Sequence, residues 1–451
     1  MLEAAIAAAA LAAFSWWTLL GPVRWVVAFL LATLLLPPLP LPWGDSGPHP
    51  ALAVAGLGVW AGLVRLGAWR LRLPAVAMTL LSLAAALALS VFMAAMHSGP
   101  RLALESAARI GLFSISVYLF LYLASGPGRE FTAGAMVRLL FAGGSCAAAF
   151  ACLDFYYQFP ALARFAEQMV WLPGGVFRRA QGLFYEASTL GVFCGFLLVM
   201  IAAIAVLRLG PALRLRFGLM LAAAAVLFTA LVLSFSRAAM VSLGISLCAM
   251  AWLERKHARA ARRALRAAGL LVAAIAVGGV LLYLLLPEFL AAYVHRLWYS
   301  GVYLLEAPNL ILSRRLENWT FLLDYLREHP WQAVLGIGYK TLPYTEHLGR
   351  PVIADNMYLS LLIETGLLGL GALFALHAAV LVSTYRWVRA SQRAGEAGAQ
   401  RLLGLWMFSF WCGFAVQMWS GDVLTYWRIL PAIFAPLAVA SRETVDDHSL
   451  S

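Results

Sequence analysis

The chain has 451 residues, of which 63% are hydrophobic and 12% charged, and its formal net charge is +12. Soluble domains carry about 25% charged residues, so this composition excludes a soluble protein with a polar surface. The mean hydropathy of +0.84 and apolar windows of about twenty residues predict an all-α polytopic membrane protein.

In chain order, the apolar windows predict about 12–13 transmembrane helices. The count on the N-terminal side stays open because the first two windows are tightly joined. The opening stretch lacks a basic region and a cleavage site, so we expect a retained span rather than a signal peptide. The predicted spans are 3–20, 22–41, 51–68, 74–96, 107–125, 133–157, 186–208, 216–235, 238–254, 266–287, 357–384, 402–419 and 424–441.

The charge of the connecting loops predicts how these helices are oriented. Arginine is concentrated in loops that the positive-inside rule assigns to the cytoplasm, namely 208–216, 254–266 and 385–401. The remaining polar segments should then lie together on the outer face, namely 158–185, 234–237, 288–355 and 420–422. Basic residues beside spans bind anionic headgroups, so the positive charge indicates membrane lipids or a phosphorylated lipid substrate rather than nucleic acid as partners.

These features divide the chain into four expected parts. They are N-terminal transmembrane helices (1–157), central helices with an outer loop leading into them (158–287), a large outer loop (288–356), and C-terminal helices with a cytoplasmic tail (357–451).

The large outer loop has its own helical pattern. From Ser313 to Glu328, apolar residues recur at helical spacing, which predicts an amphipathic helix that either lies on the bilayer or caps the bundle. His329-Pro330 should end this helix, and 335–339 should form a flexible turn because it contains two glycines. The residues expected on the apolar face are Leu316, Trp319, Leu322, Leu323 and Leu326.

Several arginines on the expected outer face are candidates for binding phosphate. The guanidinium group suits two-pronged contacts to phosphate, and arginine is less usual on the outer side of a membrane. The alternative for each is a role at lipid headgroups or in a local ion pair. The candidates are Arg178, Arg179, Arg237, Arg314 and Arg315.

A general base could come from an acid or histidine on the same face. Asp355 stands where the loop re-enters an apolar segment, and a carboxylate there needs a partner or a function. It could equally be the N-cap of the following helix. Glu186 begins a span and could cap it, pair with an arginine or bind sugar hydroxyls. The other candidates are His329, His347 and Asp422.

Motifs for other chemistries are absent from the sequence. The five cysteines lie in apolar stretches without a CxxC pair, which favours packing over disulfide or metal roles. There is no Walker motif, no HExxH motif and no DxD cluster, so nucleotide-driven transport and zinc proteolysis are disfavoured. We therefore expect neither a metal nor another cofactor.

Four segments carry a family resemblance. Arg179 to Phe184 reads Arg-x-x-Gly-Leu-Phe before a span, and 234–237 forms a Ser-Arg turn. The loop from Arg315 to Gly338 follows, and then Asp355-Asn356 with Gly366-x-x-Gly369 nine residues later. In this order, over about residues 175–375, they resemble the O-antigen ligase and O-antigen polymerase superfamily of bacterial inner-membrane proteins.

The resemblance implies a glycan transferase on the periplasmic side. Such proteins take a glycan from undecaprenyl pyrophosphate and pass it to another lipid-linked repeat, to lipid A–core or to protein. No metal or nucleotide sugar is needed, because the pyrophosphate lipid is a good leaving group. By position, Arg179, Arg237 and Arg315 would hold the pyrophosphate, with Arg314 and Glu186 close by.

The chain departs from the ligase signature at one residue. Asp355 stands where ligases have a histidine that deprotonates the acceptor, and Asn356 would orient it. This difference favours a polymerase of O-antigen or exopolysaccharide, working near a chain-length regulator. The first alternative is a ligase with the base supplied by His329 or His347. The second is a lipid or polysaccharide transporter without bond formation.

Overall fold

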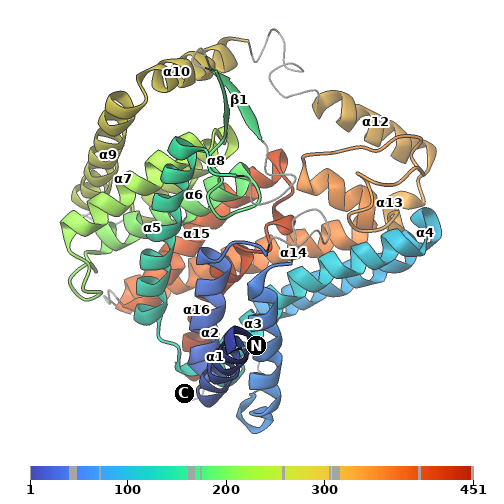
Figure 1. Ribbon diagram of the computed structural model, residues 1–451, viewed down its shortest axis with the longest axis horizontal. Coiled ribbons are helices and arrows are strands. Elements are labelled where there is room, and N and C mark those ends of the chain that lie inside the picture. Colours follow the sequence, from blue (N-terminus) through green and yellow to red (C-terminus); the bar gives the residue numbers. More distant parts are fainter. Residues whose placement is uncertain are drawn as a thin grey trace.

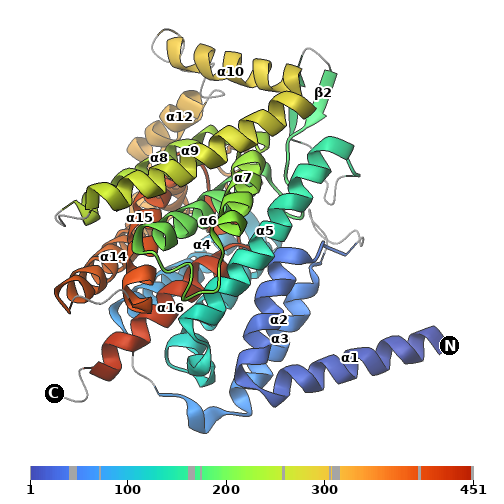
Figure 2. The ribbon, with the colours of Figure 1, turned by 90° about the vertical axis from the view of Figure 1, so that its left-hand side faces the viewer.

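The computed structural model describes residues 2–39, 48–70, 73–160, 168–172, 175–255, 260–303, 306, 315–394 and 398–447 (Figures 1 and 2). The predicted all-α fold is confirmed, with one short β-hairpin added to it, in which β1 (Met169–Leu172) pairs antiparallel with β2 (Gly175–Arg178). The α-helices are α1 (Leu2–Leu20), α2 (Pro22–Leu35), α3 (Pro50–Leu63), α4 (Ala75–Ala124), α5 (Ala133–Tyr157), α6 (Ala187–Leu207), α7 (Phe217–Leu233), α8 (Arg237–Glu254), α9 (Ala260–Leu285), α10 (Pro287–Val302), α12 (Arg315–Glu328), α13 (Gln332–Leu335), α14 (Met357–Ala394), α15 (Ala399–Gln417) and α16 (Leu430–Asp447). Short 3-10 turns are η1 (Leu66–Ala68), η2 (Pro127–Glu130), η3 (Met418–Ser420) and η4 (Val423–Thr425).

Membrane-crossing helices make up most of the fold. Within the described ranges, six helices are long and apolar enough to cross a bilayer: α4, α5, α6, α8, α14, and α15 together with η3. A seventh span is possible where α9 and α10 meet at a 118° bend. The predicted 12–13 spans exceed this number because two of them share α4 and because α2, α3, α7 and the apolar part of α16 are shorter.

Helix α4 folds back on itself as a hairpin. A straight helix of this length would be about 75 Å long, far more than the roughly 30 Å of a bilayer core. Gly99 has φ +84° and precedes Pro100, so the helical path breaks there. The two ends meet at a hydrogen bond from Arg70 N to Ser125 O (2.8 Å). The two spans predicted at 74–96 and 107–125 are therefore the two arms of α4.

The outer segments predicted to share one face do come together at one end of the bundle. Ala180 N donates to Leu233 O (3.0 Å), and Arg315 contacts Ser420 (2.9 Å). This end, which also carries α10, α12 and the β-hairpin, is called the loop end below; it is uppermost in Figure 2. At the opposite end, Glu254 and Arg401 form a buried ion pair (2.9 Å), which joins two of the arginine-rich loops.

A second, smaller core forms within the large loop. The predicted amphipathic helix is α12, and it ends at Glu328 directly before His329-Pro330. Leu322 and Tyr325 of α12 are buried against residues of the following loop and of α14, so the helix caps the bundle. Leu323 was expected on this face and is instead 43% exposed. The buried members of this core are Leu322, Tyr325, Ile337, Leu342, Leu348, Val352, Ala354, Leu359 and Ile363.

The loop after α13 is held between two membrane helices. Ser90 Oγ in α4 accepts a hydrogen bond from Tyr339 N (3.1 Å), and Arg109 in the other arm donates to Lys340 O (3.0 Å). On the other side, Gly338 N donates to Glu364 O (2.8 Å). A turn is present at the predicted position, 335–339, but these contacts hold its backbone in place, so the expected flexibility is not seen.

Helix α14 is broken at Gly366, and the backbone of Val334 and Leu335 packs against this break. Gly366 has φ +67°, and a Cβ there would lie 2.1 Å from the carbonyl oxygen of Val334. Gly366→Ala should therefore destabilise the protein by about 2 kcal/mol or more, because both the backbone and the close approach require glycine. Gly371→Ala is the matched control, since nothing lies within 4 Å of its Cβ position. Thermal unfolding of the two variants in one detergent tests this, and equal melting curves would contradict it.

Candidate active site

The start of α14 separates the roles of two adjacent residues. Asn356 is 3% exposed, and its Oδ1 accepts a hydrogen bond from Leu359 N (3.1 Å). Asn356 is therefore the N-cap of α14, and the alternative that Asp355 caps this helix is wrong. Asp355 has φ +46°, a left-handed conformation that aspartate tolerates better than most residues, and its side chain is 43% exposed.

Asp355 is paired with Arg315 from the first turn of α12. Arg315 Nε lies 3.1 Å from Asp355 Oδ2, and Arg315 Nη1 donates to Ser420 Oγ (2.9 Å). The helix is tied to the strand-like segment before α14 by Trp319 Nε1, which donates to Ala354 O (2.7 Å). These contacts bring a guanidinium group and a solvent-accessible carboxylate together, although 40 residues separate them in sequence.

The remaining predicted arginines have different surroundings. Arg179 Nε donates to Ser234 O (2.8 Å), so Arg179 lies against the turn that leads into α8, and Arg237 is the first residue of that helix. Arg178 is buried and pairs with Asp154 (2.6 Å), which is the ion-pair alternative for this residue. Arg314 lies outside the described residues.

Glu186 stands directly before α6 without a side-chain capping bond. Ser188 Oγ donates to its Oε2 (2.9 Å). Burial raises the pKa of Glu186, the positive charges of Lys340 and Arg179 lower it, and the negative charge of Asp355 raises it further. Asp355, Arg179 and Lys340 are therefore each close enough to Glu186 to influence its charge.

Lys340 is a component of this site that the sequence analysis missed. Its side chain is 12% exposed and forms an ion pair with Asp422, a candidate base whose side chain is 18% exposed and so less accessible than Asp355. Burial lowers the pKa of Lys340, while the negative charges of Glu364, Glu186 and Asp355 raise it. The sequence contains only two lysines, and this rarity among many arginines was the one feature that could have marked Lys340 as a candidate site residue.

The two histidine candidates belong to a different cluster. His329 stacks on Tyr325, and His347 contacts Gln332 (3.1 Å) and the ring of His97. Within the described part of the loop end, neither histidine contacts Asp355 or Arg315. Asp355 is the candidate base with an arginine partner and an accessible side chain.

A comparison with protein families matches part of the chain that contains several residues of the candidate site. The O-antigen ligase family model matches residues 222–375, which include Arg237, Arg315, Lys340 and Asp355. Arg179, Glu186 and Asp422 lie outside the matched segment. A search of the curated proteins found no match to this chain. The family match supports membership of the chain in the O-antigen ligase and polymerase superfamily, and with it a glycan-transferase type of activity in a multi-pass membrane protein.

Proposed function

We propose that the protein is a glycan polymerase at the periplasmic face of the bacterial inner membrane. It transfers a glycan from undecaprenyl pyrophosphate to a hydroxyl group of another lipid-linked repeat of an O-antigen or exopolysaccharide. The pair formed by Asp355 and Arg315 carries this proposal, because it combines an accessible base with a cation suited to phosphate.

The proposed reaction is a direct displacement. Asp355 takes the proton from the acceptor hydroxyl, and the acceptor oxygen forms a bond to the anomeric carbon of the donor. The bond between that carbon and the pyrophosphate oxygen breaks, and its electron pair remains on the pyrophosphate. Attack from the opposite side inverts the anomeric centre.

The positive groups of the site would stabilise the leaving group. Arg315 pairs with Asp355, the charge of Arg179 acts on Glu186, and Lys340 adds a buried positive charge close to both carboxylates. Preorganised cations of this kind favour the charge that develops on a departing pyrophosphate. Arg237 begins α8 directly after the turn that Arg179 contacts, and in this proposal it would add a further positive charge. These residues supply the charge without a metal ion.

A ligase to lipid A–core or protein is the second candidate, because the matched family model is described as O-antigen ligase. The two candidates share the donor and differ in the acceptor. A base from His329 or His347 receives less support, since both are engaged with Tyr325, Gln332 and His97. Asp355 would therefore serve as base in either case.

Reconstitution tests the proposal directly. The purified protein in vesicles, given a polyprenyl-pyrophosphate-linked repeat and a metal chelator, should form longer lipid-linked glycans without nucleotide. Failure to form any new glycosidic bond with this donor would contradict the transferase and favour a transporter. In cells, loss of a polymerase leaves single repeats, whereas loss of a ligase leaves long glycan on the lipid carrier. The second outcome would overturn the choice of polymerase.

A further inference from the structure

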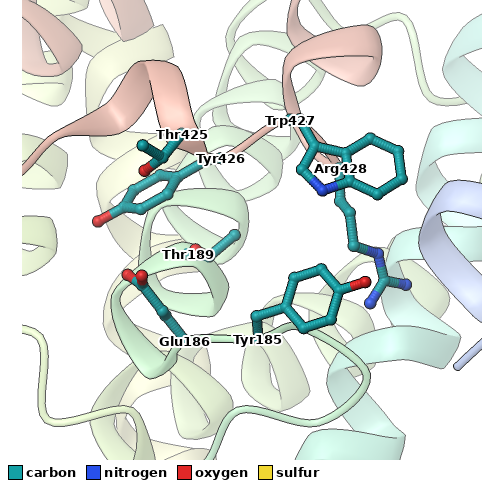
Figure 3. A pocket seen from close by; sticks show the side chains of 7 residues that line it. All are labelled: Tyr185, Glu186, Thr189, Thr425, Tyr426, Trp427 and Arg428. Carbon is teal, nitrogen blue, oxygen red and sulfur yellow. The ribbon is translucent and has the colours of Figure 1, made fainter. Parts of the chain in front are cut away.

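A small cavity lies at the loop end between the start of α6 and the segment before α16. Its volume is about 60 Å³. Glu186 and Tyr426 lie on one side and Trp427 and Arg428 on the other, with Tyr185 and Thr189 between them (Figure 3). The complete lining is Tyr185, Glu186, Thr189, Thr425, Tyr426, Trp427 and Arg428.

The cavity adjoins the candidate active site. Tyr426 OH donates to Ser188 Oγ (3.0 Å), and Ser188 Oγ donates in turn to Glu186 Oε2 (2.9 Å). Burial and, in addition, the negative charge of Asp355 raise the pKa of Glu186, so Glu186 both lines this cavity and belongs to the charged group around Asp355. In the proposed reaction, a group bound in the cavity would belong to the sugar at the reacting bond.

The volume limits what this cavity can accept. One water-sized centre needs about 10–15 Å³, so the cavity has room for roughly four or five small non-hydrogen atoms. Pockets that enclose a whole small-molecule ligand are larger, about 300–1,000 Å³. The cavity therefore fits a substituent of a sugar ring rather than the ring itself.

The walls select the chemistry of that substituent. The carboxylate of Glu186 accepts hydrogen bonds and repels phosphate. Arg428 is 1% exposed, and its guanidinium donates to the main-chain oxygens of Thr33 (2.7 Å), Leu36 (2.8 Å) and Leu183, so these groups hold it in the wall. The ring of Trp427 offers an apolar surface. A substituent with an N–H group and a methyl group matches these walls.

We propose that this cavity is a subsite for the acetamido group of an N-acetylated sugar, with Glu186 accepting from its N–H and Trp427 contacting its methyl group. The inference rests on the proposed glycan transfer, because it places that sugar at the reacting bond. A hydroxymethyl group has two non-hydrogen atoms and would fill about half of the space. The subsite would thus distinguish N-acetylated from plain sugars.

Saturation-transfer NMR on the full-length protein in lipid nanodiscs tests the subsite without requiring turnover. The probes are the methyl glycosides of N-acetylglucosamine, N-acetylgalactosamine, glucose and galactose. The acetamido methyl protons of an N-acetylated probe should receive the strongest saturation, and the plain glycosides should receive at least several-fold less. Equal signals from both kinds of probe would overturn the proposal.

Two variants test whether the N-acetylated probe binds in this cavity. Thr189→Leu fills the cavity, and Glu186→Gln removes the charged acceptor with little change in shape. Each should weaken binding of the N-acetylated probe roughly tenfold, because a buried hydrogen bond or the space for it is lost. Thr320→Leu on the exposed side of α12 is the control for the first variant and should leave binding unchanged. Unchanged binding in both cavity variants would also overturn the proposal.

The outcomes for subsite and function are separable. Strong saturation of the acetamido methyl group in a protein that forms no glycosidic bond would support the subsite and contradict the proposed glycan transfer. Glycan transfer without saturation of the acetamido methyl group would support the transfer and contradict the subsite.

Discussion

Replacement of Asp355 by asparagine should lower glycan transfer by about 10²–10⁴-fold, because a positioned general base contributes a factor of this size. Asparagine has nearly the same shape and tolerates the left-handed backbone at this position (φ +46°). The ion pair to Arg315 is partly exposed, so its loss should change the free energy of unfolding by no more than about 1 kcal/mol. The measurement is initial transfer rate at matched protein level, with polymer chain length in cells as a second readout.

Two further variants make this experiment specific. Asp324→Asn removes an exposed carboxylate that pairs with Arg327 on α12 (2.6 Å), and it should leave the rate unchanged. Asp355→His should retain more activity than Asp355→Asn, since histidine can also act as a base and also tolerates a left-handed backbone. A rate for Asp355→Asn near that of the parent protein, with long polymer, would remove Asp355 from the mechanism.

Replacement of Arg315 by alanine should lower transfer by about 10²–10³-fold, the usual effect of removing one preorganised group that stabilises a developing negative charge. Lysine should not restore the rate, because its single ammonium group cannot reproduce the fork that contacts both Asp355 and Ser420. Steady-state rates with the polyprenyl-pyrophosphate-linked donor measure this effect.

The same helix supplies the control for Arg315. Arg327→Ala removes a guanidinium group that is 78% exposed and should have no effect on the rate. Because Arg315 and Asp355 act as one unit, the double variant should be less impaired than the product of the two single effects. Fully multiplicative losses would indicate that the two residues act independently. An unimpaired Arg315→Ala variant would exclude the role assigned to Arg315.

Much of the fold could be predicted because its signals are local. Apolar windows located the helices, and His329-Pro330 marked the end of α12. Loop charge correctly grouped the segments that meet at the loop end, since short connections leave them few alternatives. The predicted 12–13 spans outnumber the six helices that are long enough to cross a bilayer among the described residues, because apolar character does not reveal helix length: α2 ends at Leu35, shortly before Pro37.

The candidate site was only partly predictable. Asp355 was selected because a carboxylate at the edge of an apolar segment needs a partner, and Arg315 because arginine suits phosphate and is less usual on the outer face. The sequence left open whether Asp355 caps α14, and it did not single out Asn356, which forms the cap, because both residue types are good N-caps. Lys340 could not be placed beside Asp422 from the sequence, because 82 positions separate them.

The sequence by itself thus determined the all-α class of a multi-pass membrane protein and which polar segments meet at the loop end, because the requirement for apolar residues acts on each helix separately. The tertiary structure alone decided the partners: Arg178 pairs with Asp154, Arg315 with Asp355, and Glu186 lines a cavity with Trp427. Ion pairing and cavity shape depend on distances of a few ångströms between helices, and those distances are set by packing rather than by neighbours in sequence.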